Sequence, residues 1–188
     1  MKSRTHSDGD LSKAVDGFRQ GSAEAFQILY KRYQNRVYRF CVRMMSSEVS
    51  GKDAFQETFM RMYEHRAEFR GTNFPAWLFT IARNVCLNLL RKQKAFDSFE
   101  EDIHGKLLST NRVENSDVLL RNSIDSAIQQ LPVKLREALI LREYEEYSYK
   151  EIAEITGIEL SLAKVRVHRA RLILRKILSP IVQERYEI

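Results

Sequence analysis

Apolar residues recur at intervals of three and four along much of the chain, the spacing of one face of an α-helix. The clearest run follows Ser22 and includes Leu29, Tyr33, Val37 and Phe40. This run predicts an amphipathic helix of about five turns that buries these side chains against neighbouring helices. Four helices are predicted in the first half of the chain, over about 10–21, 22–44, 52–67 and 76–94.

Several residues mark the expected helix ends. Asp10 and Ser22 are predicted to cap the first two helices, and Ser148 is predicted to cap a short helix over 149–156. Gly157 can adopt the left-handed turn conformation after that short helix, and Pro180 is expected to end the last helix. The predicted helices of the second half cover 118–131, 133–144, 149–156 and 161–178.

Composition supports an all-α fold made of two small helical domains. The 188 residues include only 7 Gly and 3 Pro, below the usual shares of roughly 7% and 5%, which disfavours loop-rich β folds. Apolar runs are far shorter than the roughly 20 residues that span a bilayer, so no direct membrane insertion is expected. Cys41 and Cys86 stand alone, without a Cys/His cluster, so we predict a cytoplasmic protein with no metal and no cofactor.

The formal charge of +6 is distributed unevenly, and its distribution predicts the domain boundaries. Residues 1–95 hold 17 basic and 9 acidic side chains, and residues 119–188 hold 12 and 10. The segment between them, residues 96–118, holds 2 basic and 6 acidic side chains and has weak periodicity. We therefore expect an acidic linker over 96–118 between two domains, 1–95 and 119–188.

A short helix, a glycine turn and a longer basic helix are typical of a helix-turn-helix. Residues 160–183 include six Lys and Arg side chains and no acidic one. Small, polar and cationic side chains on the outer face suit insertion into a DNA major groove. The alternative interpretation is a solvated charged helix in an ordinary bundle.

The segment 69–94 carries a different nucleic-acid pattern, with five basic residues, four aromatic residues and no acidic residue. Cations beside aromatic rings suit single-stranded nucleic acid, because unpaired bases stack on the rings. The residues around Gly71 and Pro75 predict a loop, in which Asn73 and Phe74 are expected to lie. The alternative is that the aromatic residues belong to the core.

No arrangement of residues marks a catalytic site. The four His residues are scattered, and the chain has no P-loop, no GxGxxG and no GxSxG motif. We therefore predict that the protein is not an enzyme.

Four stretches of the chain together resemble the sigma-70 family of bacterial transcription initiation factors, in its extracytoplasmic-function (ECF) group. They are 21–33 (GSAEAFQILYKRY), 53–63 (DAFQETFMRMY), 69–92 (FRGTNFPAWLFTIARNVCLNLLRK) and 131–174, which begins LPVKLREALILREY. The resemblance implies a sigma-2 and a sigma-4 domain joined by a flexible linker. It also implies binding to the largest and second-largest subunits of core RNA polymerase, to promoter DNA and to an anti-sigma factor.

The resemblance also implies roles for individual residues. The helix around 53–65 would dock on the polymerase clamp, through Asp53, Gln56, Glu57 and Met60. The segment 70–92 would read and melt the minus-ten element, through Arg70, Asn73, Phe74, Trp77, Asn84, Asn88, Arg91 and Lys92, with Trp77 packing the loop. The helix from 161 would read the minus-thirty-five element, through Ser161, Lys164, Val165, Arg166, His168, Arg169 and Arg171.

Two other functions compete with this interpretation. One is a stand-alone helix-turn-helix repressor or activator, in which residues 1–95 would serve for dimerisation or ligand binding. The other is a helical enzyme with a DNA-binding tail. Leu162, Ala163, Val165 and Asn88 depart from residues that are frequent in the family, so the promoter sequence is not transferred from any relative.

Overall fold

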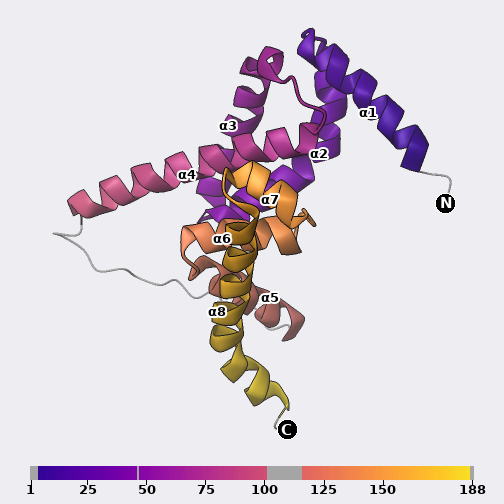
Figure 1. Ribbon diagram of the computed structural model, residues 1–188. Helices are drawn as coiled ribbons and strands as arrows, with labels where there is room; N and C mark the ends of the chain where they lie inside the picture. The colour runs from indigo at the N-terminus through magenta and orange to yellow at the C-terminus, as the bar shows by residue number, and fades with distance from the viewer. Residues whose placement is uncertain (1–3, 46, 101–115, 187–188) are drawn as a thin grey trace.

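The computed structural model describes residues 4–45, 47–100 and 116–186, and within these ranges the regular structure is entirely helical, which confirms the all-α class (Figure 1). The N-terminal module consists of α1 (Arg4–Arg19), α2 (Ala23–Met44), α3 (Glu48–Glu64), the short 3-10 helix η1 (Arg66–Glu68) and α4 (Phe74–Glu100). The C-terminal module consists of α5 (Ser116–Gln129), α6 (Val133–Glu143), α7 (Tyr149–Thr156) and α8 (Leu160–Tyr186).

In the N-terminal module α2 is the central helix, and it packs on α1, α3 and α4. Its predicted apolar face is buried, and the Ser22 hydroxyl accepts a hydrogen bond from the Ala25 N–H at its start. Gly51 allows α3 to approach α2 closely, because a Cβ atom there would lie 2.8 Å from Val42 Cα. The sequence pattern therefore describes α2 and its packing well.

The C-terminal module contains the predicted helix-turn-helix. A capping box joins Ser148 and Glu151 at the start of α7, and Gly157 ends the helix with φ 67°. On α8, the side chains of Ala163, Val167 and other small or branched residues are buried in the core, where α8 packs against α6 and α7. Close packing on this face leaves the opposite face of α8 open to solvent.

Several predicted helix boundaries are wrong. α1 begins at Arg4, so Asp10 lies inside it rather than at its cap. α3 begins earlier than predicted, at Glu48, because the Ser47 hydroxyl accepts the Ser50 N–H and caps it. α8 continues through Pro180, since proline removes one N–H donor from a helix that is otherwise intact.

Helices enter the range predicted for the linker from both ends. α4 extends to Glu100 and α5 begins at Ser116, so both helices enter the range 96–118. The rest of that prediction, residues 101–115, lies outside the described residues. None of the helices in the described ranges is both long and apolar enough to cross a membrane.

The two modules pack against each other, an arrangement that the sequence pattern does not predict. α2 contacts α5 and α6, and α4 contacts α7 (Figure 1). A row of rings crosses the boundary: the centroids of Phe40 and Phe79 are 5.4 Å apart, and those of Phe79 and Tyr147 are 5.3 Å apart. Arg136 of α6 also donates to the Met44 carbonyl at 2.9 Å. We call this arrangement the closed form.

Candidate nucleic-acid and polymerase interfaces

The aromatic residues around the loop 69–73 form part of the core rather than an exposed platform. Phe74 is the first residue of α4 and is 2% exposed, with its ring edge-to-face against Phe18 and Phe69. The prediction that Phe74 lies in the loop is wrong, because the Asn73 side chain accepts the Ala76 N–H and starts the helix immediately. Trp77 is half-buried against Phe69 and Phe74, so it packs the loop.

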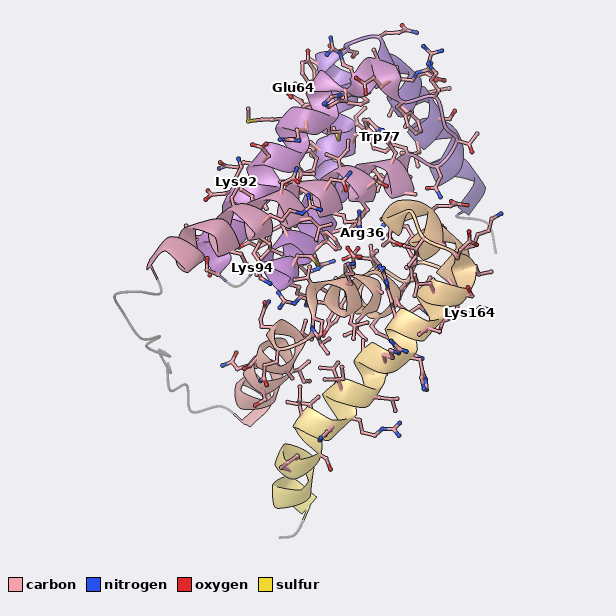
Figure 2. All side chains as sticks on the ribbon, turned by 60° about the vertical axis from the view of Figure 1, so that its left-hand side comes forward. Arg36, Glu64, Trp77, Lys92, Lys94 and Lys164 are labelled. Carbon is pink, nitrogen blue, oxygen red and sulfur yellow. The ribbon has the colours of Figure 1, made fainter. Side chains whose placement is uncertain are left out.

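The polar residues predicted to face the minus-ten element are at the surface. Arg70 and Asn73 are exposed in the loop, and Asn84, Asn88 and Arg91 follow one face of α4 at helical spacing. Arg91 donates to Asn88 Oδ1 at 3.2 Å, which orients both side chains along that face. Lys92, at the same end of the helix, is exposed, and so is Lys94 on the other side of the helix (both are labelled in Figure 2).

α8 presents most of the residues predicted for duplex reading, but not all of them. Exposed along it are Ser161, Lys164, Val165, His168, Arg169 and Arg171 (Lys164 is labelled in Figure 2). Arg171 donates to Glu143 at 2.9 Å on the surface. The Arg166 side chain is only 13% exposed and forms an ion pair with Glu137 at 3.1 Å, so it faces the core.

Glu137 is a buried carboxylate with two arginine partners that come from different modules. Its side chain is fully buried on α6, at 2.8 Å from Arg83 of α4 and 3.1 Å from Arg166 of α8. A buried charge is tolerated when it is paired and hydrogen-bonded, as this one is on both oxygens. The sequence analysis missed this triad, because the three residues are distant in sequence and no local pattern connects them.

A second set of charged residues joins α2 to the C-terminal module. Arg36 donates to the Glu145 carboxylate at 2.9 Å and to the Glu145 carbonyl at 3.1 Å (Arg36 is labelled in Figure 2). Arg43 lies 3.9 Å from Asp125 and 4.0 Å from the centre of the Tyr144 ring. Burial raises the pKa of Glu145 above its ordinary value, and the nearby arginines oppose part of that rise.

The residues predicted to contact polymerase lie on α3. Asp53, Gln56 and Met60 are exposed, and Met60 is 61% exposed although it is apolar. Glu57 is half-buried and accepts from Arg61 at 2.8 Å. An exposed apolar side chain among polar ones fits the centre of a protein–protein contact.

The described residues contain no group of three or more His, Cys, Asp or Glu side chains that could hold a metal ion. The described surface carries exposed charged residues on α4 and α8 and an exposed apolar residue on α3. A basic helix-turn-helix joined to a second basic helical module defines a DNA-binding transcription protein.

Comparisons with known proteins identify the family. Residues 29–96 match the family described as Sigma-70 region 2, and residues 121–174 match Sigma-70, region 4. The chain is 33% identical to the RNA polymerase sigma factor CarQ of Myxococcus xanthus, over 90% of this chain and 98% of CarQ. It is 30% identical to the ECF RNA polymerase sigma factor SigW of Bacillus subtilis, over 88% of this chain and 95% of SigW.

A solved structure agrees with these matches. The sigma factor RpoE of Bartonella quintana, crystallised with the anti-sigma factor NepR, superposes with a TM-score of 0.72 at 26% identity, over 84% of this chain and 98% of RpoE. The chain therefore belongs to the sigma-70 family, in the ECF group, and is a sigma factor that binds RNA polymerase and directs transcription initiation at promoters. The matches cover both modules in order, so a stand-alone repressor is not favoured.

Proposed function

We propose that the two modules divide promoter recognition, with residues 1–95 binding the minus-ten element and residues 119–188 binding the minus-thirty-five element. The second assignment depends on residues 160–183 of α8, which include six basic side chains and no acidic one, because cations and polar groups there meet phosphates and base edges. In the first module, the minus-ten contacts come from Arg70, Asn73, Asn84, Asn88, Arg91 and Lys92. Transcription with core polymerase from promoter templates that lack one element or the other tests this division.

The two promoter elements are too far apart for the closed form to read both. Their names place them roughly 25 base pairs apart, which is about 85 Å at about 3.4 Å per base pair. The modules that would read them are in contact in the closed form. The modules therefore separate when the protein works on a promoter with polymerase.

Arg169→Ala is expected to weaken minus-thirty-five binding by about 1–3 kcal/mol if the side chain reads a base, with relaxed specificity at that base pair. Binding of the holoenzyme to promoter variants at fixed salt measures the change. Arg175→Ala is the matched control, since Arg175 is also exposed on α8 and has no assigned base contact. Equal affinities for Arg169→Ala and the wild-type protein would remove Arg169 from the interface.

Met60→Ala is expected to weaken binding to core polymerase about tenfold, because the exposed side chain loses its apolar contact in the complex. Titration of core polymerase with a fluorescent derivative of the protein measures the dissociation constant. Val49→Ala is the control, because Val49 is an exposed apolar residue of the same helix outside the assigned set. Equal losses in both variants would argue against the assigned α3 surface.

We also propose an anti-sigma factor as a partner and the cytoplasm as the site of action. The likeness to RpoE, which was crystallised with NepR, supports the first assignment. The second follows from the need to reach polymerase and promoter DNA. The protein acts in this scheme through binding alone and catalyses no reaction.

A further inference from the structure

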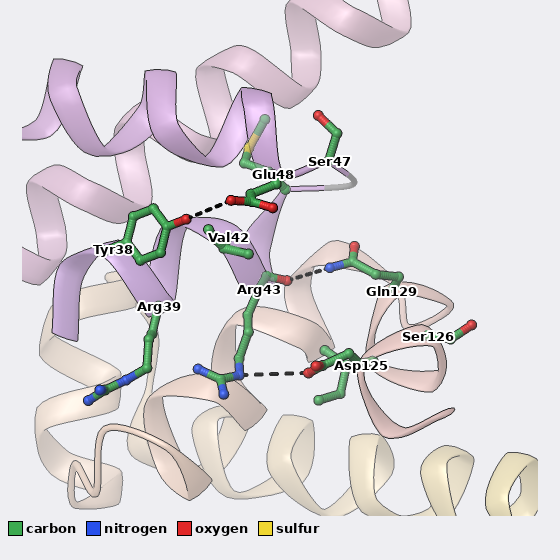
Figure 3. A pocket seen from close by; sticks show the side chains of 11 residues that line it. Tyr38, Arg39, Val42, Arg43, Ser47, Glu48, Asp125, Ser126 and Gln129 are labelled. Atoms are coloured by element: carbon green, nitrogen blue, oxygen red, sulfur yellow. Dashed lines mark hydrogen bonds and ion pairs between the residues drawn. The ribbon is translucent and has the colours of Figure 1, made fainter. Parts of the chain in front are cut away.

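Large apolar side chains at the surface are concentrated on α8. Of the eight that the described residues expose, four belong to this helix: Leu160, Leu162, Val165 and Leu172. By contrast, a pocket of about 320 Å³ between α2 and α5 is lined by charged groups of which several are already paired (Figure 3). Arg43 lies 3.9 Å from Asp125 there, and Tyr38 donates to Glu48 at 3.1 Å. The surface of α8 is therefore better suited than this pocket to contact an apolar group of a binding partner.

Val165 lies on the side of α8 that points away from the core. Ala163, Val167 and Ala170 are fully buried where α8 packs on α6 and α7. At about 100° per residue, Val165 points in nearly the opposite direction from the mean of these three side chains. Its side chain is accordingly exposed, at 40%. The packing of the module does not require an apolar residue at this position.

The side chains around Val165 form a strip that carries no permanent charge and is flanked by cations. Ser161, Val165 and His168 fall within about 60° of one another around the helix, and all three are exposed. Lys164 lies along one edge of this strip and Arg169 along the other, and both are also exposed. A helix is about 10–12 Å wide and fills a major groove of about 12 Å, so such a strip faces base edges while its flanking cations lie nearer the two phosphate backbones.

The chemistry of a valine side chain restricts what it can recognise in the groove. Valine has no hydrogen-bond donor or acceptor, and the C5-methyl of thymine is the one methyl group that the four bases present there. Contact between the two groups removes apolar surface from water on both sides. Guanine or adenine at the same place would turn polar atoms toward Val165, which would displace their water without replacing its hydrogen bonds.

We propose that Val165 is a specificity-determining residue that reads the methyl group of a thymine in the minus-thirty-five element. Ser161, one turn before it, and His168, one turn after it, reach the base pairs on either side of this thymine. The inference rests on the proposed minus-thirty-five role of α8. It adds the identity of one base that the element contains and the kind of contact that selects it.

The test removes single methyl groups from the DNA. In a promoter that the holoenzyme transcribes, each thymine of the minus-thirty-five element is replaced in turn by deoxyuridine, on both strands, and holoenzyme binding is measured at fixed salt. Deoxyuridine keeps the base pairing and lacks only the C5-methyl. At one thymine the replacement should weaken binding about fourfold, the size expected for one lost methyl contact.

The protein variant Val165→Ala identifies the side chain that makes this contact. Alanine is a good helix former and position 165 is exposed, so the melting curve should not change. The variant should bind the thymine promoter about fourfold more weakly than the wild-type protein does, and should bind the deoxyuridine promoter equally well. An effect of deoxyuridine on DNA shape alone would persist in the variant and would overturn the proposal.

Leu172→Ala is the matched control, since Leu172 is also apolar and exposed on the outer side of α8. It lies seven residues after Val165, about 10 Å further along the helix, whereas the N-terminal residues of a recognition helix contact the base edges. This variant should keep the full loss of binding on deoxyuridine replacement. Loss of the methyl effect in Leu172→Ala but not in Val165→Ala would overturn the assignment to Val165.

Replacement of the whole minus-thirty-five element by an unrelated sequence is measured in parallel. Binding and transcription that do not change on this replacement would refute the proposed function of α8. A strong loss on this replacement, together with no effect of deoxyuridine at any thymine, would refute the methyl contact alone and leave the minus-thirty-five role in place.

Discussion

Replacing Phe74 with Ala is expected to lower the free energy of unfolding by about 3–5 kcal/mol, because the change removes a buried aromatic side chain and leaves a cavity. Phe74 is 2% exposed and joins three helices, through ring contacts with Phe18 of α1, Tyr33 of α2 and Trp77 of α4. Urea unfolding monitored by circular dichroism measures the loss, and a loss of this size is a large part of the stability of most small domains.

Thr72→Ala is the control for this experiment, since Thr72 is an exposed residue of the same loop and should change stability by less than about 0.5 kcal/mol. Open-complex formation should fall in Phe74→Ala in proportion to the unfolded fraction. A variant that keeps wild-type stability but fails to melt promoters would show instead that Phe74 stacks on a base.

The local helical pattern predicted α2 and α7 well, for reasons that are local themselves. Ser22 and Ser148 cap these helices with hydrogen bonds to residues three positions away, and Gly157 ends α7 in the left-handed conformation. Each signal involves neighbours in the sequence, so periodicity and cap residues contain the needed information. The assignment of Trp77 to loop packing was also correct.

Residues whose environment depends on distant partners were predicted less well. Phe74 was predicted to lie in the loop because it follows a Gly- and Asn-containing segment. Its ring packs on Phe18, which lies far away in sequence, and the local pattern contains no sign of this contact. Arg36 and Arg166 occupy polar positions of amphipathic helices, yet both pair with carboxylates of other elements. Long-range pairing of this kind leaves no periodic signal along the chain.

The relative position of the modules depends on the same long-range pairs. Arg83 and Glu137 are 54 residues apart, and Arg36 and Glu145 are 109 residues apart. Net charge indicated a basic first module, and the structure shows that part of this charge is neutralised inside the protein. The sequence therefore predicted two nucleic-acid-binding modules but not the contact between them.

Glu137→Ala is expected to lower the free energy of unfolding by about 3 kcal/mol, because it leaves two mostly buried guanidinium groups without their shared carboxylate. Glu143→Ala is the matched control on the same helix. Glu143 pairs with Arg171 where both side chains are more than two-fifths exposed, so its loss should cost no more than about 1 kcal/mol.

Urea unfolding of both variants tests this expectation. Double-mutant cycles with Arg83→Met and Arg166→Met then measure how much of the lost free energy comes from the pairing of Glu137 with each arginine. A coupling energy between Glu137 and Arg83 shows that the ion pair across the modules forms in solution, because Arg83 is the partner contributed by α4. Coupling to Arg166 alone would mean that the isolated protein is open and that Glu137 serves only to hold α8 on α6. Equal stabilities of Glu137→Ala and Glu143→Ala would contradict the buried triad altogether.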